Sequence, residues 1–124
     1  MKILVVDDAE HMRFLLSRYF GALGHEVVAL GRGEDVPAAI AADRFDVVFS
    51  DIAMPGWNGW RVLGHVRSTQ PALPVVLMSG WDVDDGRPAG TVAPDVVLVP
   101  DAVVDKPFTL DRVREVLEKL PTAR

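Results

Sequence analysis

The sequence predicts an α/β fold, a doubly wound sheet of five parallel strands with helices on both of its faces. Short apolar runs alternate with amphipathic stretches along most of the chain, as in repeated strand–helix units. Two of the runs, residues 3–6 and 47–50, are apolar enough to be buried on both faces, which is typical of central parallel strands. Acidic, hydroxyl and lysine residues stand directly after several runs, where an open parallel sheet collects its functional groups.

The first half of the chain supplies three predicted strands and two helices. The strands cover residues 2–6, 26–30 and 45–50. Residues 9–23 carry apolar side chains at helical spacing and stop before Gly24, a residue type that commonly ends helices. A shorter helix is predicted over residues 34–42, where apolar side chains again recur at helical spacing.

The second half predicts a helix over residues 58–68, a strand over 74–78 and a last helix over 110–120. Three prolines and two glycines interrupt residues 81–105, and a regular helix of ordinary length cannot run through those prolines. The fourth helix is therefore predicted to be shortened, remodelled or replaced by a proline-rich loop. Two apolar runs, 96–99 and 102–104, are candidates for the fifth strand. We favour the second because it leads directly to Lys106.

Composition excludes several classes of function. The 124 residues fit one domain, predicted over residues 1–124, and the lack of cysteine excludes disulfides, thiolate nucleophiles and cysteine zinc sites. A net charge of −5 without a Lys/Arg cluster argues against direct nucleic-acid binding. No apolar run reaches the roughly 18 residues of a membrane span. The N-terminus has no signal-peptide pattern, so a cytoplasmic protein is predicted.

Polar groups that could act together follow four of the predicted strands. These groups are Asp7-Asp8, Asp51, Ser79-Gly80 and Lys106-Pro107. Since the carboxyl ends of parallel strands lie side by side, three carboxylates, a hydroxyl and an ammonium should meet at one edge. Three carboxylates form an oxygen-rich pocket for Mg²⁺ or Mn²⁺. A lysine and a hydroxyl beside such an ion are what an incoming phosphoryl group needs.

These residues make the chain resemble a response-regulator receiver domain, the phosphoacceptor part of bacterial-type two-component signalling. The resemblance covers essentially the whole chain and rests on Asp7-Asp8, the run Asp-Ile-Ala-Met-Pro-Gly-Trp-Asn-Gly at 51–59, Ser79-Gly80, and Lys106-Pro107-Phe108. It implies a flavodoxin-like fold and a phosphorelay protein that is phosphorylated by a histidine kinase or histidine phosphotransfer protein. It also implies a monomer or weak homodimer that catalyses its own phosphorylation and hydrolysis but turns over no outside substrate.

The resemblance implies that Asp51 is the phosphoacceptor, which becomes an aspartyl phosphate. Asp8 and Asp51 would bind Mg²⁺ directly together with the backbone carbonyl of Ala53. Asp7 would act through metal-bound water or by positioning. Lys106 would pair with Asp51 before transfer and hold a phosphoryl oxygen afterwards.

Three further positions take their expected roles from the same resemblance. Ser79 would swing to hydrogen-bond the phosphoryl group, and the small Gly80 would let the backbone approach and donate its N–H. The family usually holds the bond before Pro107 in the cis form, which points Lys106 inward. Cis bonds are uncommon even before proline.

Three positions suggest how this chain differs from its relatives. Val103 stands where the family usually has an aromatic residue that rotates on phosphorylation, so loop ordering is predicted to replace that switch. Trp81, two residues after Ser79, could screen the acyl phosphate from water, or simply pack against its loop. Phe14 lies with His11 and Arg18 on the outward face of the first helix and is a candidate anchor for the kinase or phosphotransfer partner.

Two other functions stay open at this point. The first is an interaction module with the same fold that works without phosphorylation, a hypothesis that Val103 and the unusual fourth segment keep open. The second is a magnesium-dependent phosphatase of the aspartyl-phosphate type. Such enzymes commonly place an Asp-x-Asp pair after the first strand, whereas Asp7 and Asp8 are adjacent here.

Overall fold

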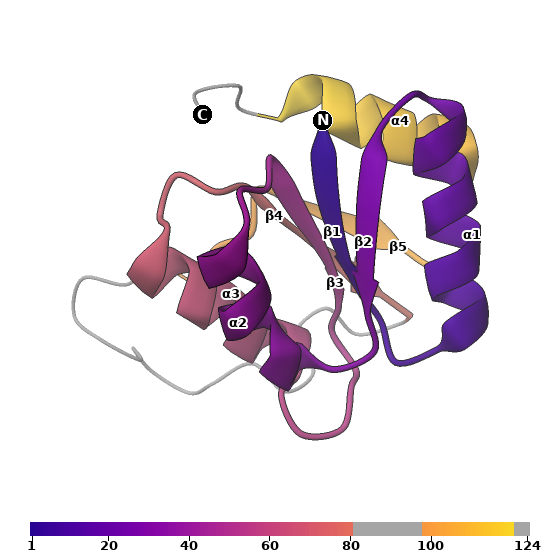
Figure 1. The fold of residues 1–124 in the computed structure, drawn as a ribbon. Helices are drawn as coiled ribbons and strands as arrows, with labels where there is room; N and C mark the ends of the chain where they lie inside the picture. The colour runs from indigo at the N-terminus through magenta and orange to yellow at the C-terminus, as the bar shows by residue number, and fades with distance from the viewer. Residues whose placement is uncertain (81–97, 121–124) are drawn as a thin grey trace.

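A five-stranded sheet of parallel strands forms the centre of the molecule (Figure 1). The structure, a computed structural model, describes residues 1–80 and 98–120. The strand order is β2-β1-β3-β4-β5. The strands are β1 (Lys2–Val6), β2 (Glu26–Leu30), β3 (Val47–Asp51), β4 (Val75–Ser79) and β5 (Ala102–Asp105). The predicted fold class is confirmed, and so is the choice of the later apolar run as the fifth strand.

Helices cover both faces of the sheet. The helices α1 and α4 lie on one face, and α2 and α3 lie on the other (Figure 1). Their bounds are α1 (Glu10–Ala22), α2 (Val36–Ala42), α3 (Gly59–Thr69) and α4 (Leu110–Lys119), and a 3-10 turn, η1 (Gly33–Asp35), precedes α2. No helix of the described residues is long and apolar enough to cross a membrane.

Three predicted elements differ from the observed ones in ways that matter for the site. The helix predicted over residues 34–42 is divided into η1 and α2, because Pro37 stands in the first turn of α2, where a missing N–H is tolerated. β3 and β4 each extend one residue further than predicted, so that Asp51 and Ser79 are the last residues of their strands. The predicted remodelling of the fourth helix lies outside the described residues and stays a prediction.

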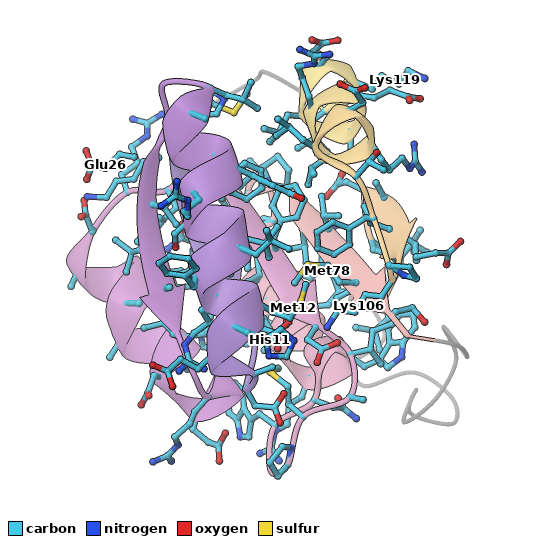
Figure 2. All side chains as sticks on the ribbon, turned by 90° about the vertical axis from the view of Figure 1, so that its right-hand side faces the viewer. His11, Met12, Glu26, Met78, Lys106 and Lys119 are labelled. Carbon is cyan, nitrogen blue, oxygen red and sulfur yellow. The ribbon has the colours of Figure 1, made fainter. Side chains whose placement is uncertain are left out.

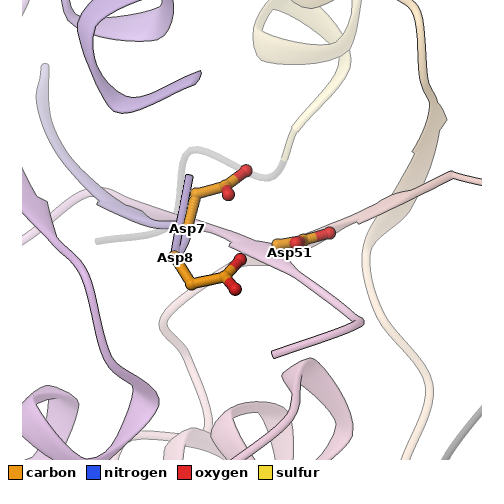
Figure 3. Close-up of side chains that lie close together, drawn as sticks. All are labelled: Asp7, Asp8 and Asp51. Carbon is orange, nitrogen blue, oxygen red and sulfur yellow. The ribbon is translucent and has the colours of Figure 1, made fainter. Parts of the chain in front are cut away.

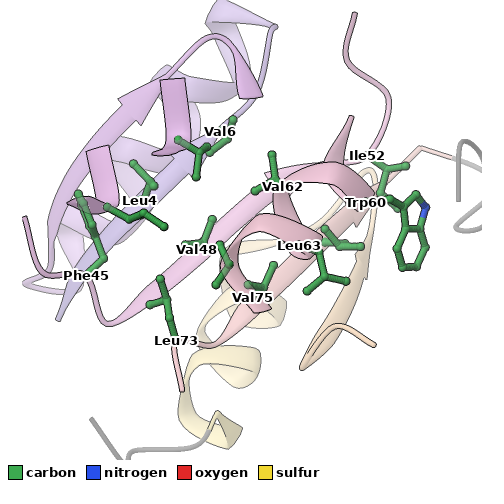
Figure 4. Packing of buried hydrophobic residues seen from close by; sticks show 14 of the residues in the cluster. Leu4, Val6, Phe45, Val48, Ile52, Trp60, Val62, Leu63, Leu73 and Val75 are labelled. Carbon is green, nitrogen blue, oxygen red and sulfur yellow. The ribbon is translucent and has the colours of Figure 1, made fainter. Parts of the chain in front are cut away.

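The sheet separates two hydrophobic clusters. One lies under α2 and α3 and includes Leu4, Val48 and the buried Trp60 (Figure 4). The other lies under α1 and α4, where the rings of Phe20 and Phe49 are 5.0 Å apart between centroids. Every residue of β3 is buried, and a fully buried apolar side chain contributes about 1.5–3 kcal/mol. The strand that ends in Asp51 is thus held rigidly from both sides.

The start of β5 is held by charged contacts at the opposite end of the sheet. The guanidinium of Arg67 in α3 donates to the carbonyl of Val99 and to the carboxylate of Asp101, each at 2.9 Å. That carboxylate also accepts the N–H of Val75 at 2.7 Å. These contacts fix where the chain enters β5, and therefore where Lys106 leaves it.

Candidate functional site

Three carboxylates and one ammonium meet at the carboxyl edge of the sheet. Asp7, Asp8 and Asp51 each offer an oxygen within 4.8 Å of the other two, and their side chains point into the same space (Figure 3). The Nζ of Lys106 lies 3.0 Å from Oδ2 of Asp7 and 3.3 Å from Oδ1 of Asp51. In Figure 2, Lys106 appears at the same end of the molecule as His11, far from Lys119.

The sheet register explains why these groups meet. Val6 pairs with Ser50, so Asp7 and Asp51 leave neighbouring strands at the same level. The backbone N–H of Lys106 donates to the carbonyl of Ser79 at 2.7 Å, which continues the ladder between β4 and β5 by one residue. The side chain of Lys106 can therefore reach back across β4 to the carboxylates. The predicted gathering of these residues at one edge is thus observed.

Asp7 and Asp8 are adjacent in sequence but have different surroundings. Asp7 is fully buried, and its two oxygens have protein partners: Oδ1 accepts the N–H of Ala9 at 2.9 Å and Oδ2 accepts from Lys106. Its carbonyl also accepts from the guanidinium of Arg13 at 2.8 Å, a contact that sequence analysis did not predict. Asp8 is exposed. This difference favours direct ligation through Asp8 and a positioning role for Asp7.

The crowding of charges shifts the acid–base behaviour of the site. Burial raises the pKa of the Asp51 carboxyl, the charge of Asp7 raises it further, and Lys106 offsets part of the rise. Burial alone lowers the pKa of the Lys106 ammonium. The hydrogen bond to Asp7 and the charges of Asp7 and Asp51 together outweigh burial, so that pKa is raised. The lysine is therefore charged at neutral pH, and burial and the neighbouring carboxylates destabilise the ionised form of Asp51.

We expect Asp51→Asn to be more stable than the wild type at pH 7 in metal-free buffer. Because folding raises the pKa of Asp51, ionisation of this residue favours the unfolded state above that pKa. Removing the charge should raise the melting temperature by about 3 °C for a domain of this size. The gain should vanish as the pH falls through the pKa of Asp51, where the wild-type carboxyl is protonated. Thermal unfolding in EDTA from about pH 4, near the ordinary aspartate pKa, up to about pH 8 measures this. An Asp51→Asn variant that is less stable than wild type at pH 7 would contradict it.

The other predicted site residues lie around this cluster. Ser79 is buried at the end of β4, and Gly80 is exposed, with no atom of the described residues within 4 Å of the place where a Cβ would stand. Ala53 is exposed in the loop that follows Asp51. The Lys106–Pro107 peptide bond is cis. Ser79, Gly80 and Ala53 therefore stand at the same carboxyl edge of the sheet as Asp51.

The positions that distinguish this chain have mixed outcomes. Phe14 is 63% exposed, the guanidinium of Arg18 lies 5.6 Å from the centroid of its ring, and His11 is exposed, so the predicted outward face of α1 is observed. Val103 is half-buried in β5. Trp81 lies outside the described residues, and its screening role stays a prediction.

Two glycines near the site are needed for close packing of the backbone, which sequence analysis did not predict. A Cβ at Gly59, the first residue of α3, would stand 2.5 Å from the carbonyl oxygen of Asp51. A Cβ at Gly33 would stand 2.7 Å from the Cβ of Trp57. Both glycines permit close backbone approaches to the segment after Asp51. Only Gly59 belongs to a recognised run of the sequence, and nothing in the sequence around Gly33 connects it with Trp57.

The donor set fits a hard divalent cation. All three acidic side chains offer oxygen ligands within one small space, and the exposed Asp8 leaves the cluster accessible. Mg²⁺ is bound in proteins through one or two carboxylates together with water and phosphate oxygens. A cation here would also offset the repulsion that raises the pKa of Asp51.

Comparison with known proteins assigns the family. The family model described as the response regulator receiver domain matches residues 3–118. The chain belongs to this family. The receiver is 34% identical to the probable transcriptional regulatory protein TcrX of Mycobacterium tuberculosis over 111 residues, which cover 90% of the chain and 45% of TcrX. It is 38% identical to the response regulator protein FleR of Pseudomonas aeruginosa over 84 residues, 68% of the chain and 18% of FleR.

The receiver fold is also seen in a solved relative. The response regulator protein TrrA of Thermotoga maritima, crystallised in complex with Mg²⁺ and BeF, superposes with a TM-score of 0.82 at 27% identity. The match covers 97% of this chain and 98% of TrrA. The chain spans less than half the length of TcrX and FleR, so what those whole proteins do is not carried over. The predicted membership of the receiver family in two-component systems is confirmed.

Proposed function

We propose that this receiver accepts a phosphoryl group on Asp51 from a histidine kinase or a histidine phosphotransfer protein, and that it signals by conformational change. The observation that carries the proposal is the position of Lys106, whose ammonium lies between Asp7 and Asp51 while Asp8 stays exposed. A carboxylate is a weak nucleophile and needs placement and charge neutralisation more than activation by a base. Lys106 supplies the neutralisation, and the buried β3 supplies the placement.

The transfer exchanges one bond for another at phosphorus. A carboxylate oxygen of Asp51 attacks, the new O–P bond forms, and the P–N bond of the phosphohistidine breaks. The electron pair of that bond goes to the imidazole nitrogen, which takes up a proton from solvent. Lys106 then moves its hydrogen bond from the Asp51 carboxylate to a phosphoryl oxygen. The hydroxyl of Ser79 donates a hydrogen bond to the same group.

Asp8, Asp51 and the carbonyl of Ala53 are the proposed ligands of Mg²⁺ or Mn²⁺, and Asp7 acts through water or by positioning. When bound, the ion supplies positive charge that offsets the carboxylates and the phosphoryl oxygens. Asp7 keeps its own hydrogen bonds to Ala9 and Lys106, so it holds the lysine in reach of the reacting group. Self-catalysed hydrolysis of the aspartyl phosphate, rather than turnover of an outside substrate, ends the signal.

We place the phosphodonor partner on the outward face of α1. Phe14 is an exposed aromatic residue on the helix that follows Asp7 and Asp8, and Arg18 stacks beside it. An apolar anchor flanked by a cation suits a protein partner. The proposal includes a cytoplasmic location and a monomer or weak homodimer, without direct binding to nucleic acid or membrane by this domain.

Intact mass after incubation with acetyl phosphate and Mg²⁺ tests the proposal. We expect the mass of one phosphate to be added to the wild type, and none to be added to Asp51→Asn or in the presence of EDTA. A phosphorylated Asp51→Asn variant would place the acceptor elsewhere. If the folded wild type stays unmodified both with acetyl phosphate and with a phosphorylated histidine phosphotransfer protein, the proposal is wrong.

A receiver used as an interaction module without phosphorylation is the second candidate. It is favoured by Val103, which has no ring to rotate between buried and exposed positions. This candidate predicts that the wild type binds no Mg²⁺. The phosphatase candidate is weaker, because both carboxylate oxygens of Asp7 are engaged by Ala9 and Lys106 and the two acids that follow β1 are adjacent. It requires steady turnover of a phosphate monoester.

A further inference from the structure

Two consecutive residues of η1, Gly33 and Glu34, contact the backbone of the loop that follows the phosphoacceptor. Gly33 approaches Trp57 so closely that a Cβ at Gly33 would stand 2.8 Å from the carbonyl oxygen of Trp57. Glu34 places Oε1 at 3.4 Å from the backbone N–H of Trp57, which donates to it. We call these two residues the Gly33–Glu34 clasp. The clasp joins parts of the chain more than twenty residues apart.

The clasp also depends on Gly56. This glycine has a φ of +74°, a conformation that L side chains rarely adopt. A Cβ at Gly56 would stand 2.5 Å from Oε2 of Glu34. The carboxylate thus lies directly against the loop backbone, with one oxygen toward Trp57 and the other beside Gly56.

Further contacts hold the loop at its inner side. The N–H of Ile52 donates to the carbonyl of Met78 at 3.0 Å, and the N–H of Gly59 donates to the carbonyl of Ile52 at 3.0 Å. The side chain of Met54 is buried in the cluster under α3. The exposed Ala53 therefore stands between inner contacts with the sheet and outer contacts with the clasp.

The charge of Glu34 suits this position. The pKa of its carboxyl is lowered by its own backbone N–H, by the N–H of Trp57 and by the nearby Arg32 and Arg61, against a smaller opposing effect of desolvation. A guanidinium nitrogen of Arg32 lies 3.7 Å from Oε2 of Glu34. The guanidinium of Arg61 lies over the Trp57 ring, 4.6 Å from its centroid. The outer turn of the loop is thus held by an ionised carboxylate and by packing.

We infer that Glu34 is a positioning residue of the divalent-cation site, because it fixes the loop that carries Ala53 and so strengthens the binding of Mg²⁺. The inference rests on the proposed function, since it gives that loop a part in holding the ion. Glu34 itself does not touch the three carboxylates. It acts through Gly56 and Trp57, as residues behind metal ligands generally do.

Titration of Mg²⁺ into the wild type and three variants by calorimetry tests the inference. Glu34→Ala removes the hydrogen bond to Trp57 and should weaken Mg²⁺ binding about five- to tenfold, near the lower limit for residues that position metal ligands without binding the ion. Glu34→Gln keeps an oxygen that accepts the N–H of Trp57 and should stay within about twofold of wild type. Asp35→Asn removes the same charge from the next residue, an exposed acid of η1, and should change nothing.

A double-mutant cycle with Gly56→Ala separates the effect of the Glu34 contact with the loop from a general destabilisation of the loop. In the wild type the new Cβ should push the Glu34 carboxylate away and weaken Mg²⁺ binding. In the Glu34→Ala background only the backbone strain at Gly56 remains, so the second substitution should cost less. Amide exchange at Trp57 should be faster in Glu34→Ala than in Glu34→Gln, which reports the lost contact independently of metal.

The outcomes distinguish this inference from the proposed function. A wild type that binds no Mg²⁺ overturns the proposed function and the inference together. A wild type that binds Mg²⁺ beside a Glu34→Ala variant of equal affinity overturns the inference alone, even if the variant melts earlier. Strictly additive effects of Glu34→Ala and Gly56→Ala on Mg²⁺ affinity also overturn it.

Discussion

Replacing Lys106 with methionine should destabilise the domain by about 2–3 kcal/mol at pH 7 in metal-free buffer. The side chain of Lys106 is 21% exposed, and its ammonium lies between Asp7, which is fully buried, and Asp51. Methionine fills similar space but leaves both carboxylates without their cation. Loss of one partner of a buried pair costs about 3–5 kcal/mol, and the partial exposure of Lys106 reduces that figure. Urea unfolding in EDTA measures the change in the free energy of unfolding.

The pH dependence and a control variant make the Lys106 prediction specific. Lys106 lowers the pKa of Asp51 against burial, so without it the pKa of Asp51 should rise further. The penalty should therefore shrink as the pH falls through that pKa, and Mg²⁺ should restore part of the loss at neutral pH. Lys119→Met removes a 74% exposed lysine paired with Glu115 and should leave stability unchanged. Equal stability of Lys106→Met and wild type at pH 7 would contradict the prediction.

The strands and their edge could be predicted because their signal is local. A strand buried on both faces must be a short apolar run, and β1, β3 and β4 are such runs. The parallel arrangement then brings the residues that follow these strands to one edge, and Asp7, Asp51 and Lys106 do meet there. Apolar periodicity and strand polarity together thus fix both the fold and the location of the site.

The internal division of the site could not be predicted in the same way. Asp7 and Asp8 are identical in type and adjacent, and only the folded chain shows that Asp7 is engaged by Ala9 and Lys106 while Asp8 is exposed. The contact between Glu34 and Trp57 joins η1 to the loop after β3, and neither segment carries a periodicity that pairs it with the other. Such contacts depend on the three-dimensional path of the backbone, which local patterns of apolar and turn residues do not reveal.

Gly59→Ala should cost about 2–4 kcal/mol of folding free energy, although alanine is the better helix former. Gly59 begins α3, and a Cβ there would stand 2.5 Å from the carbonyl oxygen of Asp51 and 2.9 Å from the Cα of Ile52. Both are backbone atoms and cannot rotate away. The added methyl group must therefore displace either the start of α3 or the end of β3. Chemical unfolding measures the loss, and calorimetry should show weaker Mg²⁺ binding because the crowded carbonyl belongs to Asp51 itself.

The same substitution elsewhere provides the matched control. Gly21 is exposed in α1, and a Cβ there would meet nothing within 4 Å. Gly21→Ala should therefore stabilise the domain by about 0.5–1 kcal/mol, the usual preference for alanine over glycine in a helix. Stability changes of opposite sign in Gly21→Ala and Gly59→Ala would show that the penalty at Gly59 arises from its close contact with the backbone of Asp51 rather than from helix propensity. If Gly59→Ala is as stable as wild type and binds Mg²⁺ equally well, the contact between Gly59 and Asp51 can relax without moving the phosphoacceptor. The rigid placement of Asp51 by β3 would then be the wrong account of its reactivity.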